Sequence, residues 1–229
     1  MSEYLTRNRW LLILAVSIAI SSCVNNQQVT YLQDYELSPY GDEYVPPEDY
    51  LIQPNDNLYV RIATPDPSLS AIFNSMDERG MMRADEASAH LISYPVELDG
   101  TIDIPYLGHV EVAGLTLPQA KAAIEEVLSE YVSDASLTIK LVNNYVSVMG
   151  EVMVPGLYPI YKERLNIYQA LAMAGDLDDF GDRYAVSVIR QTAEGSMVKE
   201  FDITDKKIID SEFYYVMPND IIYVLSLIH

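Results

Sequence analysis

The stretches IQPNDNLYVRI (residues 52–62) and VMPNDIIYVLS (residues 216–226) repeat one pattern, Pro-Asn-Asp followed by Leu or Ile, Tyr and Val. Proline fixes φ and lacks a backbone N–H, and Asn and Asp suit turn conformations, so each Pro-Asn-Asp predicts a turn that starts a strand. The apolar and aromatic residues that follow are strand formers. The two copies lie too far apart for a short-period repeat. We therefore predict that two different modules use the same turn-and-strand unit.

The first 22 residues have the features of a secretory signal. Arg7 and Arg9 precede the apolar run WLLILAVSIAI, which ends in small residues. The run is shorter than the roughly 20 residues that a membrane-spanning helix needs. Cys23 is the single cysteine of the chain, so an internal disulfide is excluded. The ending Ile-Ser-Ser-Cys resembles the lipobox of bacterial lipoproteins, which implies a lipidated Cys23; the alternative is an ordinary signal peptide. Residues 23–49 have little periodicity and are expected to form a tether.

The formal net charge of −20 limits the classes of partner. Such a surface repels nucleic acid phosphates and anionic lipid headgroups, so both are excluded as main partners. After Cys23 no stretch reaches membrane-spanning length. The composition indicates an acidic, exported globular protein.

Alternating apolar residues and one helical period organise the first half of the folded chain. We expect a strand at 58–63, then a long stretch without a sustained period up to residue 91. Residues 94–98 and 102–104 alternate around Asp99-Gly100 and predict a β-hairpin with its turn there. Thr116 and Gln119 have capping-box spacing, which predicts an amphipathic helix at 116–131 that packs through Ile124, Val127 and Leu128.

The second half shows strand patterns around one short helix. A strand is expected at 137–141 and another at 145–152, followed by a turn at Pro155-Gly156. NIYQALAMA (166–174) predicts a helix that ends at Gly175. Further strands are expected at 184–191, 197–202 and 220–224. Because strands and helices mix without strict alternation, the fold class is predicted to be α+β.

Taken in order, five motifs resemble the bacterial outer-membrane polysaccharide export proteins. They are YLIQPNDNLYVRI, VELDGTIDIPYLGHVEVAGLTLPQAKAAIEEVL, VSVMGEVMVPGLYPI, LNIYQALAMAGDL and MPNDIIYV. The resemblance implies a polysaccharide export domain at 50–143, with a mixed sheet and one amphipathic helix, then one soluble-ligand-binding β-grasp domain at 144–226. Asn55 and Asn219 stand where the family usually has glycine, and Asn also tolerates positive φ.

The resemblance also implies a function. It implies an outer-membrane lipoprotein that faces the periplasm and forms a homo-oligomeric ring, a conduit for capsular or extracellular polysaccharide, with an inner-membrane polysaccharide co-polymerase as partner. Pore-forming members end in an amphipathic helix, whereas this sequence ends five residues after Val224, so that helix is either trimmed or naturally absent. In the second case we expect a separate outer-membrane partner, for which a β-barrel is the candidate. The alternative function is a monomeric, lipid-tethered glycan-binding protein.

Candidate site residues follow from residue chemistry. Tyrosine rings contact sugars while their hydroxyls hydrogen-bond, so Tyr94, Tyr106 and Tyr158 are candidate glycan-facing residues, with core packing as the alternative. The acidic GDLDDFGD (175–182) lacks the ligand spacing of an EF-hand loop and is interpreted as a solvated loop. The histidines lack zinc-ligand spacing, and neither a nucleophile elbow nor a phosphate-binding loop occurs. We expect no enzyme activity, no metal and no cofactor; a glycosidase is the third option.

Overall fold

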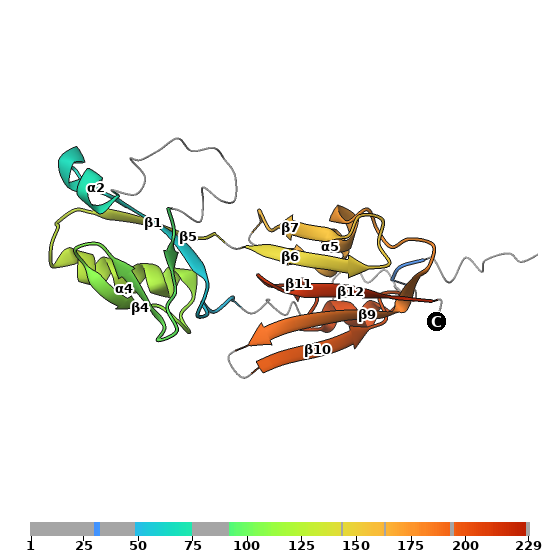
Figure 1. Ribbon diagram of the computed structural model, residues 1–229. Coiled ribbons are helices and arrows are strands. Elements are labelled where there is room, and N and C mark those ends of the chain that lie inside the picture. The colour runs from blue at the N-terminus through green and yellow to red at the C-terminus, as the bar shows by residue number, and fades with distance from the viewer. Residues whose placement is uncertain are drawn as a thin grey trace, which may run out of the picture.

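The computed structural model describes residues 30–32, 49–74, 92–142, 144–162, 164–192 and 195–227. Figure 1 shows the described chain as two lobes, which we define as residues 49–142 and residues 144–227. Each lobe has a separate cluster of buried apolar side chains. Both lobes combine strands with helices, so the predicted α+β class is confirmed.

The first lobe is built on a three-stranded antiparallel sheet. Its central strand is β1 (Asn57–Ala63), which pairs with β2 (Tyr94–Pro95) on one side and β5 (Ser136–Leu141) on the other. Leu58, Val60 and Ile62 of β1 are buried, because alternate side chains of a strand point to the same face. The strand predicted after the first Pro-Asn-Asp is therefore confirmed.

Helix α4 (Leu117–Ser129) covers the buried face of this lobe. Thr116 is its N-cap, and the reciprocal hydrogen bonds between Thr116 and Gln119 form the predicted capping box. Ile124 and Leu128 are buried in the core, and Val127 packs partly buried beside them. Both the helix and its predicted packing face are confirmed.

The hairpin of the first lobe uses a different turn from the predicted one. The ladder joins β3 (Thr101–Ile104) to β4 (Gly108–Glu111), whereas β2 pairs with β1. Asp99-Gly100 does turn the chain, and Gly100 has a φ of +88°. A Cβ on Gly100 would come within 2.9 Å of the Ala113 Cβ, so the residues after β4 lie against this turn. The expected pairing was wrong because Tyr94 belongs to the β1 sheet.

A short helix interrupts the stretch that we expected to lack regular structure. Helix α2 (Pro67–Phe73) begins after Asp66, whose side chain accepts a hydrogen bond from the Ser68 N–H. Its single buried residue is Phe73, which joins the core of the first lobe. Seven residues are too few to show a helical period, so the sequence pattern missed this helix.

The second lobe is a five-stranded mixed sheet with the strand order β10-β9-β12-β6-β7. Strands β12 and β6 are parallel to each other, and the other three neighbouring pairs are antiparallel. Because the first strand of the lobe, β6, lies beside its last, β12, the sheet is β-grasp-like. The strands are β6 (Tyr145–Gly150), β7 (Gly156–Pro159), β9 (Gly181–Thr192), β10 (Gly195–Phe201) and β12 (Ile221–Ser226).

Helix α5 (Ile167–Met173) packs on one face of this sheet. Asn166 caps it, with a second capping box to Gln169, and Ile167, Ala170 and Leu171 are buried. A two-stranded sheet of β8 (Leu165–Asn166) and β11 (Tyr215–Val216) and a 3₁₀-helix, η3 (Lys206–Asp210), complete the lobe. These short elements were not predicted. The helix and the strands expected around it are confirmed.

The close pairing of the parallel strands β6 and β12 requires a glycine at position 150. Gly150 at the end of β6 has a φ of +88°, and a Cβ there would lie 2.0 Å from the Val224 carbonyl oxygen of β12. Any larger residue would push the two strands apart. Gly150 therefore sets how closely the last strand of the chain docks.

Candidate functional site

The first Pro-Asn-Asp turn is closed by a buried carboxylate. Asn55 has a φ of 71°, in the left-handed region that Asn tolerates. The Asp56 N–H donates to the Gln53 carbonyl oxygen at 3.1 Å, and the Gln53 N–H donates to Asp56 Oδ2 at 2.9 Å. Asp56 is 2 % exposed. The turn is thus held by reciprocal hydrogen bonds between two residues.

The second turn repeats this geometry. Asn219 has a φ of 67°, the Asp220 N–H donates to the Met217 carbonyl oxygen at 3.1 Å, and the Met217 N–H donates to Asp220 Oδ2 at 2.7 Å. Asp220 is 1 % exposed. The repeated sequence therefore encodes a repeated structure, as predicted.

The two carboxylates differ in their second partner. Asp56 accepts a hydrogen bond from the Tyr50 hydroxyl at 2.8 Å. Asp220 is paired with the Arg190 guanidinium, whose Nε and Nη2 lie 3.0 and 2.8 Å from its two oxygens. Arg190 also donates to the Tyr215 carbonyl oxygen at 2.9 Å and lies over the Phe213 ring. Burial raises the pKa of Asp220, and Arg190 acts in the opposite direction.

Tyr50 lies near both turns, at the boundary between the lobes. Burial is the largest cause that raises the pKa of its hydroxyl, followed by the Asp56 carboxylate, while the Asn219 side chain acts in the opposite direction. Nearby, the Gln53 side chain donates to the Gln191 carbonyl oxygen at 3.3 Å. Residues of the first turn therefore contact the second lobe beside the second turn. The sequence repeat did not predict this meeting.

Tyr31 attaches the chain before the first lobe to the second lobe. Its hydroxyl donates to the Asp176 carboxylate, its ring packs edge-to-face on Tyr168, and the Arg183 guanidinium lies 5.7 Å from its centroid. Burial, with help from Asp176, raises the pKa of Tyr31. The acidic loop after α5 thus has a structural contact with the predicted tether. Cys23 lies outside the described residues.

The three candidate glycan-facing tyrosines occupy three different environments. Tyr94 is 6 % exposed and belongs to the core of the first lobe. Tyr158 is half-buried against the second core, and its hydroxyl donates to the Val154 carbonyl oxygen. Tyr106 is 70 % exposed at the turn between β3 and β4, with its ring edge-to-face with Phe73. The structure does not bring the three together, and Tyr106 alone offers a largely exposed ring.

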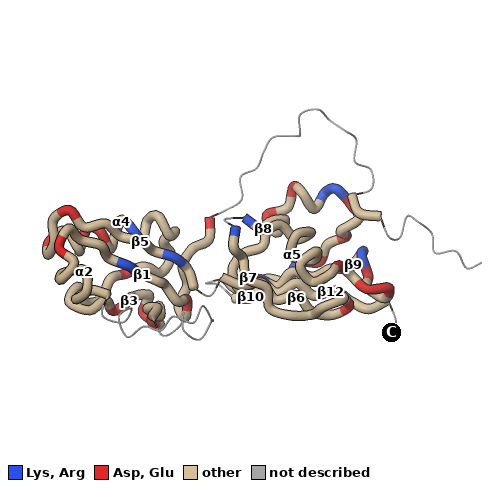
Figure 2. The backbone as a smooth tube through the Cα atoms, turned by 90° about the horizontal axis from the view of Figure 1, so that it is seen from above, with Lys and Arg blue, Asp and Glu red and all other residues tan. Residues whose placement is uncertain are grey.

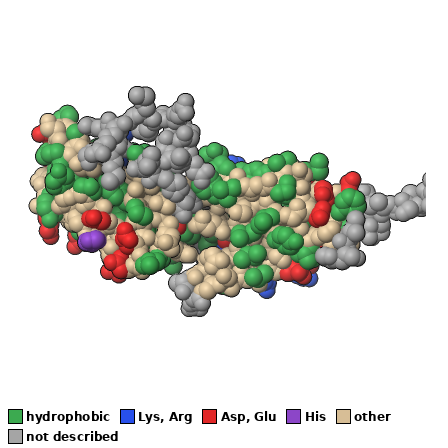
Figure 3. All heavy atoms as spheres, viewed as in Figure 1, with side chains coloured by type: hydrophobic (Ala, Val, Ile, Leu, Met, Phe, Trp, Pro, Cys, Tyr) green, Lys and Arg blue, Asp and Glu red, His purple; other side chains and the backbone are tan. Residues whose placement is uncertain are grey.

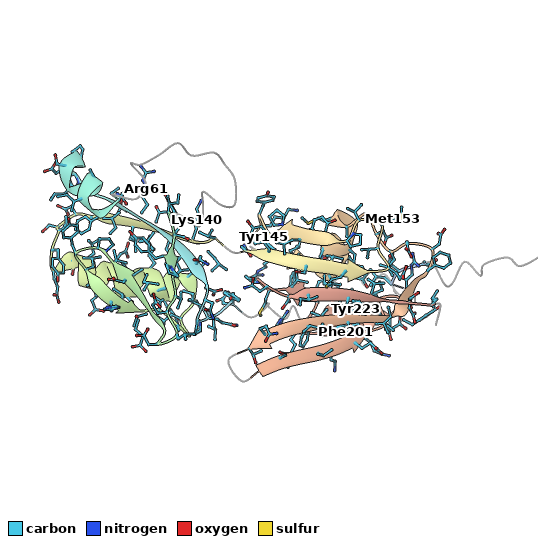
Figure 4. The ribbon with its side chains drawn as sticks, in the orientation of Figure 1. Arg61, Lys140, Tyr145, Met153, Phe201 and Tyr223 are labelled. Atoms are coloured by element: carbon cyan, nitrogen blue, oxygen red, sulfur yellow. The ribbon has the colours of Figure 1, made fainter. Side chains whose placement is uncertain are left out.

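A basic patch lies on the first lobe, on the outward face of β1 and β5. We define the basic patch as Tyr59, Arg61, Thr138 and Lys140. In the antiparallel register Tyr59 is opposite Lys140, and Arg61 is opposite Thr138. Arg61 and Lys140 are exposed, and Figure 4 shows both on the same side of the lobe. Sequence reasoning missed this patch because it depends on strand register.

The outward face of the second sheet carries several exposed apolar side chains, and the register places Glu200 of β10 on the same face. Met149, Leu157, Val198 and Tyr223 are exposed to between 43 and 65 %. The register places Tyr223 beside Met149, and Figure 4 shows Tyr145 and Tyr223 on neighbouring strands of this lobe. Apolar side chains also spread over the visible surface of the second lobe in Figure 3. An exposed apolar face of this kind is typical of a contact surface.

The described ranges contain neither a clustered metal site nor a membrane-spanning helix. No group of three or more Asp, Glu, His or Cys residues there has the geometry of a metal site. Among the helices of those same ranges, none has the length and apolar character to span a membrane.

Comparison with known proteins connects the first lobe to a family. Residues 45–142 match the family model described as polysaccharide biosynthesis/export protein. These residues are a polysaccharide export domain. The resemblance inferred from the motifs is therefore confirmed for this part of the chain, and β1, β5 and α4 are elements of the export domain.

Two curated proteins are similar to the chain over 101 residues, at 30 % identity. They are the EPS I polysaccharide export outer membrane proteins EpsA of Ralstonia solanacearum and of Ralstonia nicotianae. The matched stretch is 42 % of this chain and only 27 % and 26 % of the two relatives. The chain thus matches only about a quarter of the length of each relative.

Proposed function

We propose that this chain is a lipid-anchored, periplasm-facing outer-membrane protein that forms an oligomeric conduit for export of capsular or extracellular polysaccharide. The observation that carries the proposal is the export domain at 45–142, folded around β1, β5 and α4. The named relatives are polysaccharide export outer membrane proteins. The chain acts by forming a path and docking partners, among them an inner-membrane co-polymerase, and not as an enzyme.

The anchor is the acylated Cys23. The contacts of Tyr31 with Asp176 and Tyr168 support an orientation for the protein on the membrane. Tyr31 is the eighth residue after Cys23, and eight fully extended steps of the chain span only about 29 Å. The part of the second lobe that contacts Tyr31 is thus held within about 29 Å of the lipid, and both lobes face the periplasm.

The second lobe is the β-grasp domain at 144–226, and its apolar sheet face supports oligomerisation. A net charge of −20 makes copies of the chain repel one another. On the exposed face the four side chains Met149, Leu157, Val198 and Tyr223 are uncharged, and Glu200 is the carboxylate that the register of β9 and β10 places on that face, so copies approach there with less repulsion. This face is the contact between neighbouring copies of the ring.

The alternative is a monomeric, lipid-tethered glycan-binding protein. Its support is the exposed ring of Tyr106 beside Phe73, which remains the candidate glycan-facing residue of the predicted three.

Two experiments test the proposal. In the source bacterium, deletion of the gene should abolish surface polysaccharide, and the intact gene should restore it; a deletion strain with normal surface polymer would overturn the export role. Native mass spectrometry of the detergent-extracted, full-length protein should show a ring of several copies. A strictly monomeric species under those conditions would favour the alternative.

A further inference from the structure

The charge of the export domain is unevenly distributed. Figure 2 shows acidic residues over both lobes and far fewer basic ones. In the described part of the export domain the basic residues are Arg61, Lys121 and Lys140. Two of these three lie in the basic patch. Among the described residues of this domain, positive charge is therefore concentrated on one face.

The basic patch contains no carboxylate. The outward positions of the three strands are taken by neutral or basic residues only: Asn57, Tyr59, Arg61 and Ala63 of β1, Pro95 of β2, and Ser136, Thr138 and Lys140 of β5. Diagonal neighbours on a sheet face lie about 7–8 Å apart, so Arg61 and Lys140 flank one small area. Both charges are presented to the same ligand-sized region.

The two cations are not neutralised by the described part of the protein. Lys121 pairs with Glu125 at 3.6 Å on the surface of α4, but no ion pair of Arg61 or Lys140 occurs among the described residues. The position of Lys140 has a structural explanation without a ligand: β5 is an edge strand, and a lysine on an edge strand disfavours pairing with a strand of another molecule. Arg61 lies on the central strand, where that reason does not apply.

We infer that the basic patch binds acidic sugar units, the carboxylates of a uronic-acid-containing polysaccharide, an assignment that rests on the proposed export function. A polyanion is repelled by a chain of net charge −20 except where positive charge is concentrated. The planar Arg61 guanidinium suits bidentate recognition of a carboxylate, and Lys140 adds a second charge. Tyr59, directly opposite Lys140, adds an aromatic ring for apolar contact with a sugar.

The binding test uses the full-length protein and two probes of equal length, an oligogalacturonate and a neutral dextran oligomer. Calorimetry should detect oligogalacturonate only, with an affinity that falls as salt rises because the contacts are exposed charges. Arg61→Gln with Lys140→Gln should weaken binding about fivefold to tenfold, as expected for two exposed ion pairs. The matched control Lys121→Gln should leave the affinity within about twofold, because Lys121 lies outside the patch.

Amide chemical-shift mapping of the wild-type protein gives a second readout that needs no variant. Oligogalacturonate should shift amide signals of β1 and β5, and dextran should not. Equal binding of both probes, unchanged affinity in the double variant, or shifts confined to the second lobe would each overturn the inference.

An export assay separates this inference from the proposed function. If deletion of the gene abolishes surface polysaccharide but the double variant binds oligogalacturonate normally, the basic patch is not the binding site, and the export role is retained. If the deletion strain exports normally while the patch binds as described, the export role is wrong and the patch stands as a binding site.

Discussion

Asp56 and Asp220 occupy equivalent places in the two lobes: each buried carboxylate accepts a hydrogen bond from the backbone N–H three residues before it, at 2.9 and 2.7 Å. What distinguishes them is the group that completes each site. A neutral hydroxyl, Tyr50, completes the first, and a cation, Arg190, completes the second. The repeat is therefore one turn with two different ways of stabilising its buried charge.

Asp56→Ala should destabilise the first lobe more than Tyr50→Phe. Alanine leaves both the Gln53 N–H and the Tyr50 hydroxyl without their acceptor, whereas Tyr50→Phe removes one donor and keeps the turn closed. We expect a loss of about 2–4 kcal/mol for Asp56→Ala and about 1 kcal/mol for Tyr50→Phe. Urea unfolding measures both. Equal losses for the two variants would show that Asp56 stabilises the lobe only through its hydrogen bond with Tyr50, and that its hydrogen bond with the Gln53 N–H adds nothing.

Asn55 tests the backbone conformation of the turn. Its φ of 71° suits glycine, so Asn55→Gly should change the free energy of unfolding by less than about 0.5 kcal/mol. Asn55→Val places a β-branched residue in the left-handed region and should cost about 1–2 kcal/mol. As a control, Thr138→Val on the exposed strand β5 should be nearly neutral. A tolerated valine at residue 55 would mean that the turn relaxes to negative φ.

Arg190→Met should make stability strongly dependent on pH. Removing the cation leaves Asp220 buried and unpaired, at a cost of about 3–5 kcal/mol near neutral pH. The folded-state pKa of Asp220, already raised by burial, then rises further. The folded state holds a proton that the unfolded chain releases, so stability is highest in acid and is lost as pH rises through the folded-state pKa.

The check on Arg190→Met is urea unfolding near pH 4.5 and pH 7.5. The penalty relative to wild type should be smaller at the lower pH. Asp220→Asn in the same chain should recover part of the loss at pH 7.5, because the neutral amide still accepts from Met217. A penalty of the same size at both pH values would contradict an ionised, buried Asp220.

Ile124→Ala should empty a site in the core of the export domain. Ile124 is fully buried on α4, so we expect a loss of about 2–5 kcal/mol in the free energy of unfolding. Glu125→Ala on the exposed side of the same helix removes a weak ion pair and should cost less than about 0.5 kcal/mol. If both substitutions cost the same small amount, α4 would not pack on the sheet as described.

Cys23→Ser should release the protein from membranes into the soluble periplasmic fraction, because the proposed acyl chains need the thiol. Cell fractionation and immunoblotting measure the distribution, and Ser22→Ala is the matched control that keeps both the cysteine and a small residue beside it. Membrane partitioning of Cys23→Ser at the wild-type level would refute lipidation.

Much of the local structure was predictable from residues close together in sequence. The capping box of Thr116 and Gln119, the helix ending near Gly175 and the two Pro-Asn-Asp turns depend on hydrogen bonds and φ preferences within a few residues. The α+β class followed from the mixture of these patterns. Helix α2 escaped because its seven residues carry no period and its start depends on the single cap Asp66.

The sequence allowed us to choose candidate site residues by their chemistry, but it did not predict which residues surround them in the fold. Tyr94 and Tyr106 are the same residue type in similar apolar patterns, yet one pairs into the β1 sheet and is buried while the other turns outward with a φ of 70°. Period-2 alternation assigns faces within one strand but does not say which strand pairs with which. For that reason Asp99-Gly100 suggested the wrong ladder, and the register that makes Arg61 and Lys140 diagonal neighbours was not predicted.

The sequence by itself determined the turn chemistry, the helices with caps, the acidic charge and the export-domain motifs, since each depends on residue identity and short spacing. Only the tertiary structure decided that Gln53 donates to the Gln191 carbonyl oxygen, that Tyr31 docks beside Tyr168, and that Arg190 neutralises Asp220. These contacts join residues far apart in the chain. They form because burying an aromatic ring or a carboxylate requires a partner, and the packing of the two lobes decides which residue that partner is.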